Sequence, residues 1–401
     1  MTTTLRAFVA ALAAALATIV IDVGPVQANH RPNNEVLVGG AISMTGQYAE
    51  PAGRNVNSIK LWVDDVNGRG GLLGHKIVLR LLDDKSDVQT SIKLYEKLIT
   101  EDKVDLVLGP YSSGITEAVA NITERSKMPF VAYGASAETI WQKGRRYIFN
   151  IVAPAESFQK GAVHLAKQAG VKTAAVIAQD SLFPRQSAQG AKEWAKKLGI
   201  EIVLEENYPP KQMDFTALLQ KIKAAGAEAI FANSYFADTA AQLRQMRELN
   251  LNFKLYAGTV GPALPNFPEQ LGATADYILG FSLWEPQPKI FGFPGMQEFI
   301  DRYEKRYGEK PNYHAGASYG GLQVTEAAVK KAGSFDGEKL REAMATIDVQ
   351  TIFGHYKADA KGMNSHEGIT FQILKGQRRV VWPERLAETK AELPMPEWSK
   401  R

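Results

Sequence analysis

Between residues 36 and 281 the chain alternates between short apolar runs and longer segments in which apolar residues recur every three or four positions. The short runs predict buried β-strands and the longer segments predict amphipathic α-helices. Regular β–α alternation favours parallel sheets with right-handed crossovers. The predicted strands are 36–42, 77–82, 105–109, 130–133, 173–178, 201–205, 229–232, 254–257 and 277–281.

The pattern changes after residue 281. Four prolines interrupt it, and helical segments follow at 296–307, 313–332 and 337–347. Two short apolar runs, 371–374 and 380–382, then flank a Lys-Gly-Gln turn, which predicts an antiparallel pair.

The first 28 residues are typical of a secretory signal peptide. Arg6 precedes an apolar stretch, and Val26, Gln27 and Ala28 fit the small-x-small rule for cleavage. The alternative is a membrane anchor, but the apolar run of about 15 residues is shorter than the ~20 of a spanning helix. We therefore expect cleavage after Ala28 and a periplasmic protein.

Cleavage there would leave 401 − 28 = 373 residues, which favours two domains over one core. The chain has no cysteine, which excludes disulfides, thiolate metal sites and cysteine nucleophiles. The net charge of +4 is modest, and basic and acidic residues are interleaved, so we expect no nucleic-acid partner. No histidine has metal-ligating spacing, so we predict no metal; we also predict no cofactor and no catalytic residue.

The first predicted strand ends in a loop of small and hydroxyl-bearing residues that carries Tyr48 and leads into a helix. Open α/β sheets bind small ligands at the carboxyl ends of their strands, beside helix N-termini. The loop contains neither GxGxxG nor GxxxxGK[ST], so it does not predict a nucleotide site.

Four further stretches occur in a fixed order: VNGRGGLLG at 66–74, LDDKSD at 82–87, LGPYSSG at 108–114 and MPFVAYGAS at 128–136. Each is weak alone. Together, behind a signal peptide, they resemble the type I periplasmic substrate-binding proteins, close to the leucine/isoleucine/valine-binding family of ABC importers. The resemblance covers about residues 35–385.

The resemblance implies an α/β fold of two doubly wound, Rossmann-like lobes with parallel sheets, joined by a three-crossing hinge. Lobe one would be residues 29–152 plus 283–350, and lobe two 153–282 plus 351–390, with 391–401 as a peripheral tail. It also implies a non-enzymatic, monomeric solute-binding component that captures a small ligand between its lobes. The partners would be the membrane permease subunits of an ABC importer.

Seven residues are expected to bind the ligand: Tyr48, Ser113, Ala135, Ser136, Phe183, Tyr235 and Thr259. The resemblance makes Ser113 the serine that contacts a carboxylate, and a hydroxyl at a helix start is also suited to bind an anion. The alternative for Ser113 and Ser136 is a plain helix N-cap. The resemblance gives Ala135 and Ser136 a carbonyl and a hydroxyl contact, and the three aromatic residues would line the cleft.

One departure from the family pattern bears on the ligand. Amino-acid binders place an acid after the strand equivalent to 254–257 to hold the α-ammonium, whereas this loop reads Gly-Thr-Val-Gly. A buried, unpartnered ammonium costs roughly several kcal/mol. Glu50 or Asp180 could substitute. Arg54 and Arg185 could pair with a carboxylate, or could be solvated surface arginines.

The ligand stays open between hydrophobic or branched-chain amino acids, aromatic or other apolar carboxylates, and amides or urea. The alternative function is a ligand-sensing receptor of the same fold that feeds a signalling partner. A secreted α/β enzyme would need convergent titratable groups, and the predicted cleft offers hydroxyls and aromatic rings instead.

Overall fold

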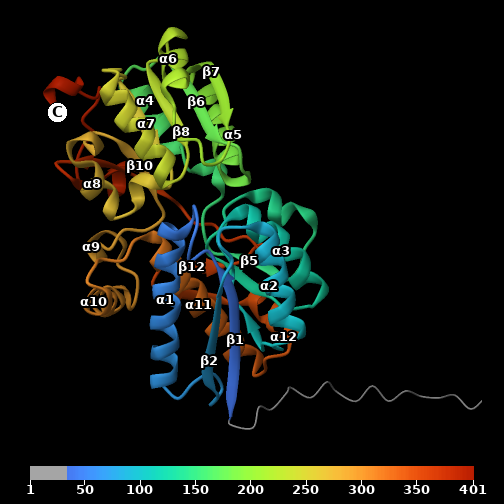
Figure 1. The fold of residues 1–401 in the computed structure, drawn as a ribbon. Helices are drawn as coiled ribbons and strands as arrows, with labels where there is room; N and C mark the ends of the chain where they lie inside the picture. Colours follow the sequence, from blue (N-terminus) through green and yellow to red (C-terminus); the bar gives the residue numbers. More distant parts are fainter. Residues whose placement is uncertain (1–33) are drawn as a thin grey trace, which may run out of the picture.

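A computed structural model describes residues 34–401, and the predicted signal peptide lies outside them. Within this range, no helix combines the length and apolar character that a membrane span requires. Figure 1 shows two groups of elements, one above the other, with the C-terminus at the upper group. The predicted fold class is confirmed: both groups are α/β with mainly parallel sheets.

The lower group, lobe one, is built on β1, which pairs in parallel with β2 and β3. A second parallel pair, β4 and β5, and an antiparallel hairpin, β11 and β12, complete its strands. The strands are β1 (Glu35–Ile42), β2 (Lys76–Asp83), β3 (Leu106–Val107), β4 (Phe130–Ala132), β5 (Ile148–Asn150), β11 (Asp348–Thr351) and β12 (Gly354–Lys357). The helices are α1 (Ala49–Gly68), α2 (Val88–Thr100), α3 (Ser113–Arg125), α9 (Pro288–Phe291), α10 (Met296–Tyr307), α11 (Tyr313–Ala332) and α12 (Gly337–Thr346), with the 3-10 helix η1 (Glu138–Lys143).

The upper group, lobe two, holds a seven-stranded sheet in the order β14-β13-β10-β9-β8-β6-β7. The five strands from β6 to β10 are parallel, and β13 and β14 add an antiparallel edge. The strands are β6 (Thr173–Gln179), β7 (Glu201–Tyr208), β8 (Ala229–Asn233), β9 (Leu255–Gly258), β10 (Leu279–Ser282), β13 (Ile369–Leu374) and β14 (Gln377–Trp382). The helices are α4 (Lys160–Gln168), α5 (Leu182–Leu198), α6 (Thr216–Ala224), α7 (Phe236–Glu248) and α8 (Asn266–Leu271).

The chain passes between the lobes three times. The first connection, 151–159, joins β5 to α4 and contains η2 (Ala155–Ser157); the second, 283–287, joins β10 to α9; the third, 358–368, joins β12 to β13. We propose the lobe boundaries at these connections. The third lies after the expected residue 351, because β12 pairs with β11 of lobe one.

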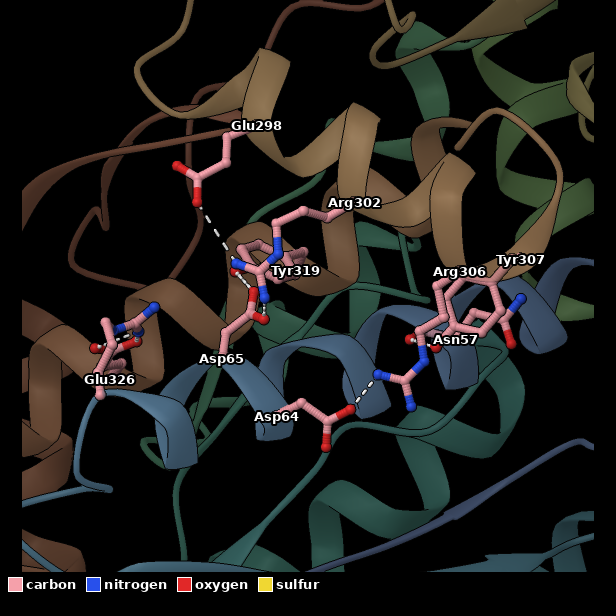
Figure 2. Close-up of polar contacts among 10 residues, drawn as sticks. Asn57, Asp64, Asp65, Glu298, Arg302, Arg306, Tyr307, Tyr319 and Glu326 are labelled. Atoms are coloured by element: carbon pink, nitrogen blue, oxygen red, sulfur yellow. Dashed lines mark hydrogen bonds and ion pairs between the residues drawn. The ribbon is translucent and has the colours of Figure 1, made fainter.

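Polar contacts fasten two helices of lobe one to α1 (Figure 2). The side chain of Asp65 is only 1% exposed, and it accepts a hydrogen bond of 2.5 Å from the Tyr319 hydroxyl of α11 and pairs with Arg302 of α10. Asp64 pairs with Arg306 of α10 beside it. A buried carboxylate needs such partners, so these contacts fix how α10 and α11 lie on α1.

The segment expected as a peripheral tail packs against lobe two. The backbone N–H of Met395 donates to the Lys254 carbonyl at 2.8 Å, and the Trp398 indole donates to the Leu251 carbonyl at 2.8 Å. Met395 is buried.

Candidate functional site

A cavity lies where the two lobes face each other, at the carboxyl ends of their strands. We call it the cleft cavity. Its volume is about 20 Å³, which is room for one water molecule. Both lobes and the first two connections line it, so the lobes are closed on one another. The lining residues are Tyr111, Ser112, Ser113, Tyr133, Gly134, Ser136, Val152, Phe158, Phe183, Tyr235, Val260, Leu283, Tyr313 and His314.

Ser113 joins two loops of the cleft cavity. It is the first residue of α3, and its Oγ accepts hydrogen bonds from the backbone N–H groups of Ser136 at 3.1 Å and Ala137 at 3.2 Å. A hydroxyl has two acceptor positions and one proton, so the proton remains for donation to a ligand oxygen. The N-cap Ser112 makes no side-chain capping bond, so the dipole and first-turn N–H groups of α3 add to this preference for an anion.

Six lining residues carry phenyl or phenol rings: Tyr111, Tyr133, Phe158, Phe183, Tyr235 and Tyr313. Phe183 lies 4.9 Å from Phe158 and 6.1 Å from Tyr235, measured between ring centroids. Burial raises the pKa of Tyr111 and of Tyr235 well above the ordinary value, so both are neutral. The buried Tyr133 hydroxyl has no hydrogen-bond partner among residues 34–401.

His314 is also neutral. Its Nδ1 lies 3.3 Å from the Asn312 amide nitrogen, which only donates, so Nε2 carries the proton toward the Tyr111 hydroxyl at 3.3 Å. The Asn312 orientation is fixed because its oxygen caps α11 by accepting from the Ala315 N–H. Burial, with a smaller contribution from the charge of Arg54, lowers the pKa of His314 to about 3.

None of the lining residues is Asp, Glu, Lys or Arg. The acids considered as ammonium partners are engaged elsewhere: Glu50 accepts from the Asn266 amide at 3.0 Å, and Asp180 pairs with Arg185. Asp238 accepts from the Tyr208 hydroxyl at 2.6 Å and from the Tyr235 N–H at 2.9 Å. Burial raises the pKa of Asp238 to about 6, against the lowering effect of the Tyr208 hydrogen bond.

The structure brings four of the predicted residues into the lining: Ser113, Ser136, Phe183 and Tyr235. Tyr48 lies against the ring of Tyr235 at 4.9 Å, across the lobes. The Ala135 carbonyl accepts from Asn150 at 3.3 Å.

The other three predicted residues, like Tyr48 and Ala135, lie outside the lining. The Thr259 hydroxyl donates to the Ser234 carbonyl at 2.8 Å and accepts from the Ser234 N–H at 3.0 Å, and its neighbour Val260 faces the cavity instead. Arg54 pairs with Glu309, and the half-exposed Arg185 pairs with Asp180.

Sequence reasoning missed several lining residues, including Tyr111, Phe158, Tyr313 and His314. Tyr111 lies inside the motif at 108–114, two residues before Ser113, so its place in a strand-end loop was a usable signal. Tyr313 and His314 open α11, just after the cap residue Asn312. Phe158 is in the first connection and carries no sequence signal.

A family model described as periplasmic binding protein matches residues 35–378. Leu/Ile/Val-binding protein homolog 7 of Brucella suis biovar 1 (strain 1330) is 26% identical over 396 residues, covering 94% of this chain and 98% of the relative. The isoleucine complex of the branched-chain amino acid transporter substrate-binding protein LivJ from Streptococcus pneumoniae has a TM-score of 0.78 at 22% identity, covering 87% and 100% of the two chains. The benzoate complex of an ABC transporter solute-binding protein from R. palustris has a TM-score of 0.77 at 19% identity, covering 89% and 98%.

Proposed function

Since the chain belongs to the periplasmic binding protein family, as its sequence motifs predicted, we propose that it captures a small carboxylate between its lobes and delivers it to the permease subunits of an ABC importer. The proposed ligand has an apolar or aromatic body and no ammonium group. It binds outside the cytoplasm, in the periplasm, and the protein performs no catalysis.

The observation that carries this proposal is the composition of the cleft cavity. Ser113 and the start of α3 offer proton donors to a carboxylate, and most of the other lining residues contribute rings or apolar side chains. With no acid in the lining, an α-ammonium would be buried without a countercharge, at a cost of roughly several kcal/mol.

The relatives support different ligands. The Brucella relative is named for leucine, isoleucine and valine, which carry an ammonium, whereas the R. palustris structure holds benzoate, which does not. The acid-free lining of this chain favours the second kind.

A cavity of about 20 Å³ is too small for any of these ligands, so binding requires the lobes to open and then close around the ligand. The Tyr48–Tyr235 ring contact and the Asn266–Glu50 hydrogen bond join the lobes directly and have to separate first.

The test is a thermal-shift screen of the refolded mature chain with benzoate, hydroxybenzoates, phenylacetate, leucine, isoleucine and short amides. A ligand at 100 times its Kd adds about 2.7 kcal/mol to the free energy of unfolding, which raises Tm clearly. Rises with carboxylates that lack an ammonium are expected. Rises with α-amino acids alone would contradict the proposed ligand, and no rise with any carboxylate would contradict the proposed function.

A further inference from the structure

A second, larger cavity lies along the first and third connections, and we call it the hinge cavity. Its volume is about 610 Å³, within the usual range of roughly 300–1,000 Å³ for small-molecule sites. Glu138 lines it from lobe one, Lys160 and Trp382 line it from lobe two, and Ser157 and His366 line it from the connections. Both lobes therefore line the hinge cavity.

Two opposite charges in the hinge cavity have no countercharge among residues 34–401. Lys160, half-buried at the start of α4, forms no ion pair; its ammonium lies 4.9 Å from the Trp194 ring and 5.6 Å from the Trp382 ring instead. Glu138, half-buried at the start of η1, also forms none. The ring contacts preorganise the ammonium and leave it available to an anion.

The other charged residues of this lining are already satisfied. Lys357 pairs with Asp348 at 3.1 Å, and Glu367 pairs with Arg385. Asp359 accepts from backbone N–H groups of its own loop. Asp359 also has no ion pair, so among the described residues the lining charges with neither an ion pair nor a hydrogen bond are Lys160 of lobe two and Glu138 of lobe one.

The carboxyl group of Glu156 also favours a cation near Glu138. Glu156 sits between the lining residues Pro154 and Ser157, and its buried Oε2 has no hydrogen-bond partner among the described residues. Burial, and then the charges of Glu138 and Glu193, raise its pKa to about 7. An ammonium placed beside Glu138 would also be attracted to this carboxyl group.

We propose that the hinge cavity is a second binding site, for a small zwitterion of the amino-acid class. Its carboxylate pairs with Lys160 and its ammonium with Glu138, so the ligand bridges the two lobes from the hinge side. The hinge cavity supplies both charges that the cleft cavity lacks.

A ligand that bridges both lobes binds one hinge angle better than others, so it is linked to ligand binding in the cleft. The coupling is reciprocal. If the bound zwitterion changes the affinity of the protein for the cleft ligand by some factor, then the bound cleft ligand changes the affinity for the zwitterion by the same factor.

The proposal is tested by titration calorimetry of the mature chain with glycine, γ-aminobutyrate and leucine as probes, at about pH 8, where Glu156 is ionised. Lys160→Met keeps the apolar stem over the tryptophans and removes only the charge, and Glu138→Gln does the same for the acid. Each is expected to weaken binding of a probe at least about tenfold, since one ion pair is lost.

Matched controls are Lys357→Met and Glu367→Gln, which remove lining charges that already have partners. They are expected to leave the Kd of the probe within about twofold. Ser113→Ala reports on the cleft, and the Tm of each variant confirms that it is folded.

The proposal is overturned if no probe binds, or if Lys160→Met and Glu138→Gln both leave the Kd unchanged. Loss of probe binding in Ser113→Ala, with full binding in the two hinge variants, assigns the probe to the cleft and also overturns it.

Discussion

The cleft cavity measures about 20 Å³ and is lined by rings and hydroxyls, whereas the hinge cavity measures about 610 Å³ and is lined by five charged side chains among others. The two cavities differ in their lining because they differ in exposure to solvent. Closure of the cleft removes solvent, and an unpaired charge there would be costly, so recognition depends on shape and hydrogen bonds. The hinge cavity stays open enough to solvate unpaired charges, so it can select by charge.

A carboxylate side chain in the cleft would give this cavity a charge of its own, and we expect it to have the largest effect on ligand affinity. Val260 lines the cavity in the loop where amino-acid binders carry their acid. Val260→Asp is expected to weaken binding of the cognate carboxylate by about 3 kcal/mol, more than a hundredfold, because two like charges are buried together. Calorimetry should also detect new binding of leucine. An unchanged carboxylate affinity would mean that this side chain does not face the ligand.

Removing the Ser113 hydroxyl tests whether uncharged hydrogen-bond donors of the cleft cavity bind the carboxylate. Ser113→Ala is expected to weaken carboxylate binding by about 2 kcal/mol, since one charged hydrogen bond is lost. It also leaves the N–H groups of Ser136 and Ala137 without their acceptor, so a fall in stability of about 1–2 kcal/mol is expected as well.

The control is Ser318→Ala, which removes a buried hydroxyl that bonds only within α11, to the carbonyls of His314 and Ala315. It should leave the Kd of the carboxylate unchanged. Equal affinities in Ser113→Ala and the wild type would remove Ser113 from the site.

On the hinge side, stability should depend on pH through Glu156. The folded-state pKa of Glu156, about 7, lies above its ordinary 4.5. Its contribution to stability is therefore present below about pH 4.5 and is lost as pH rises toward 7. Glu156→Gln is expected to raise stability relative to the wild type above pH 7 but not at low pH, by about 1 kcal/mol after allowance for solvent screening.

Thermal unfolding at the two ends of this pH range measures the effect. Glu138 on η1 and Glu193 on α5 are the charged groups that act on Glu156. Glu201→Gln, at an exposed position on β7, is the control and should give the same difference at both ends. A Glu156→Gln difference that is constant with pH would place this carboxyl group in full contact with solvent.

The smallest expected effect concerns Arg185. Its side chain is 57% exposed and pairs with Asp180 outside both cavities. Arg185→Gln is expected to change stability and the Kd of the carboxylate by less than about 0.5 kcal/mol, because exposed ion pairs contribute little. A tenfold loss of affinity would instead support the sequence-based idea that Arg185 pairs with the ligand.

Most of the fold could be predicted because parallel strands are buried on both faces and read as apolar runs. The strands missed were β5, with three residues, and the hairpin of β11 and β12, whose strands are short and partly exposed. Neither has a long enough apolar pattern to stand out from a loop.

The lining of the cleft cavity could be predicted in part, where the position of a residue in a single strand-end loop is enough to place it there. Ser113, Ser136, Phe183 and Tyr235 follow directly from such loops. His314 and Phe158 reach the cavity from α11 and the first connection, which depends on how distant segments pack and on lobe closure. Within the loop at 258–261, the backbone decides that Val260 rather than Thr259 faces the cavity, and composition does not reveal that choice.

The place of β13 in the lobe-two sheet has a consequence for the chain as it is synthesised. Strand β10 pairs with β9 on one side and with β13 on the other. In the sequence, β13 follows β10 only after the helices α9 to α12 and the hairpin of β11 and β12, which belong to lobe one. Until residue 369 is available, β10 presents an open apolar edge that can pair with another molecule. Shortened chains that end before β13 should therefore aggregate. In the full chain, β13 covers the edge of β10 and so prevents it from pairing with other copies of the protein.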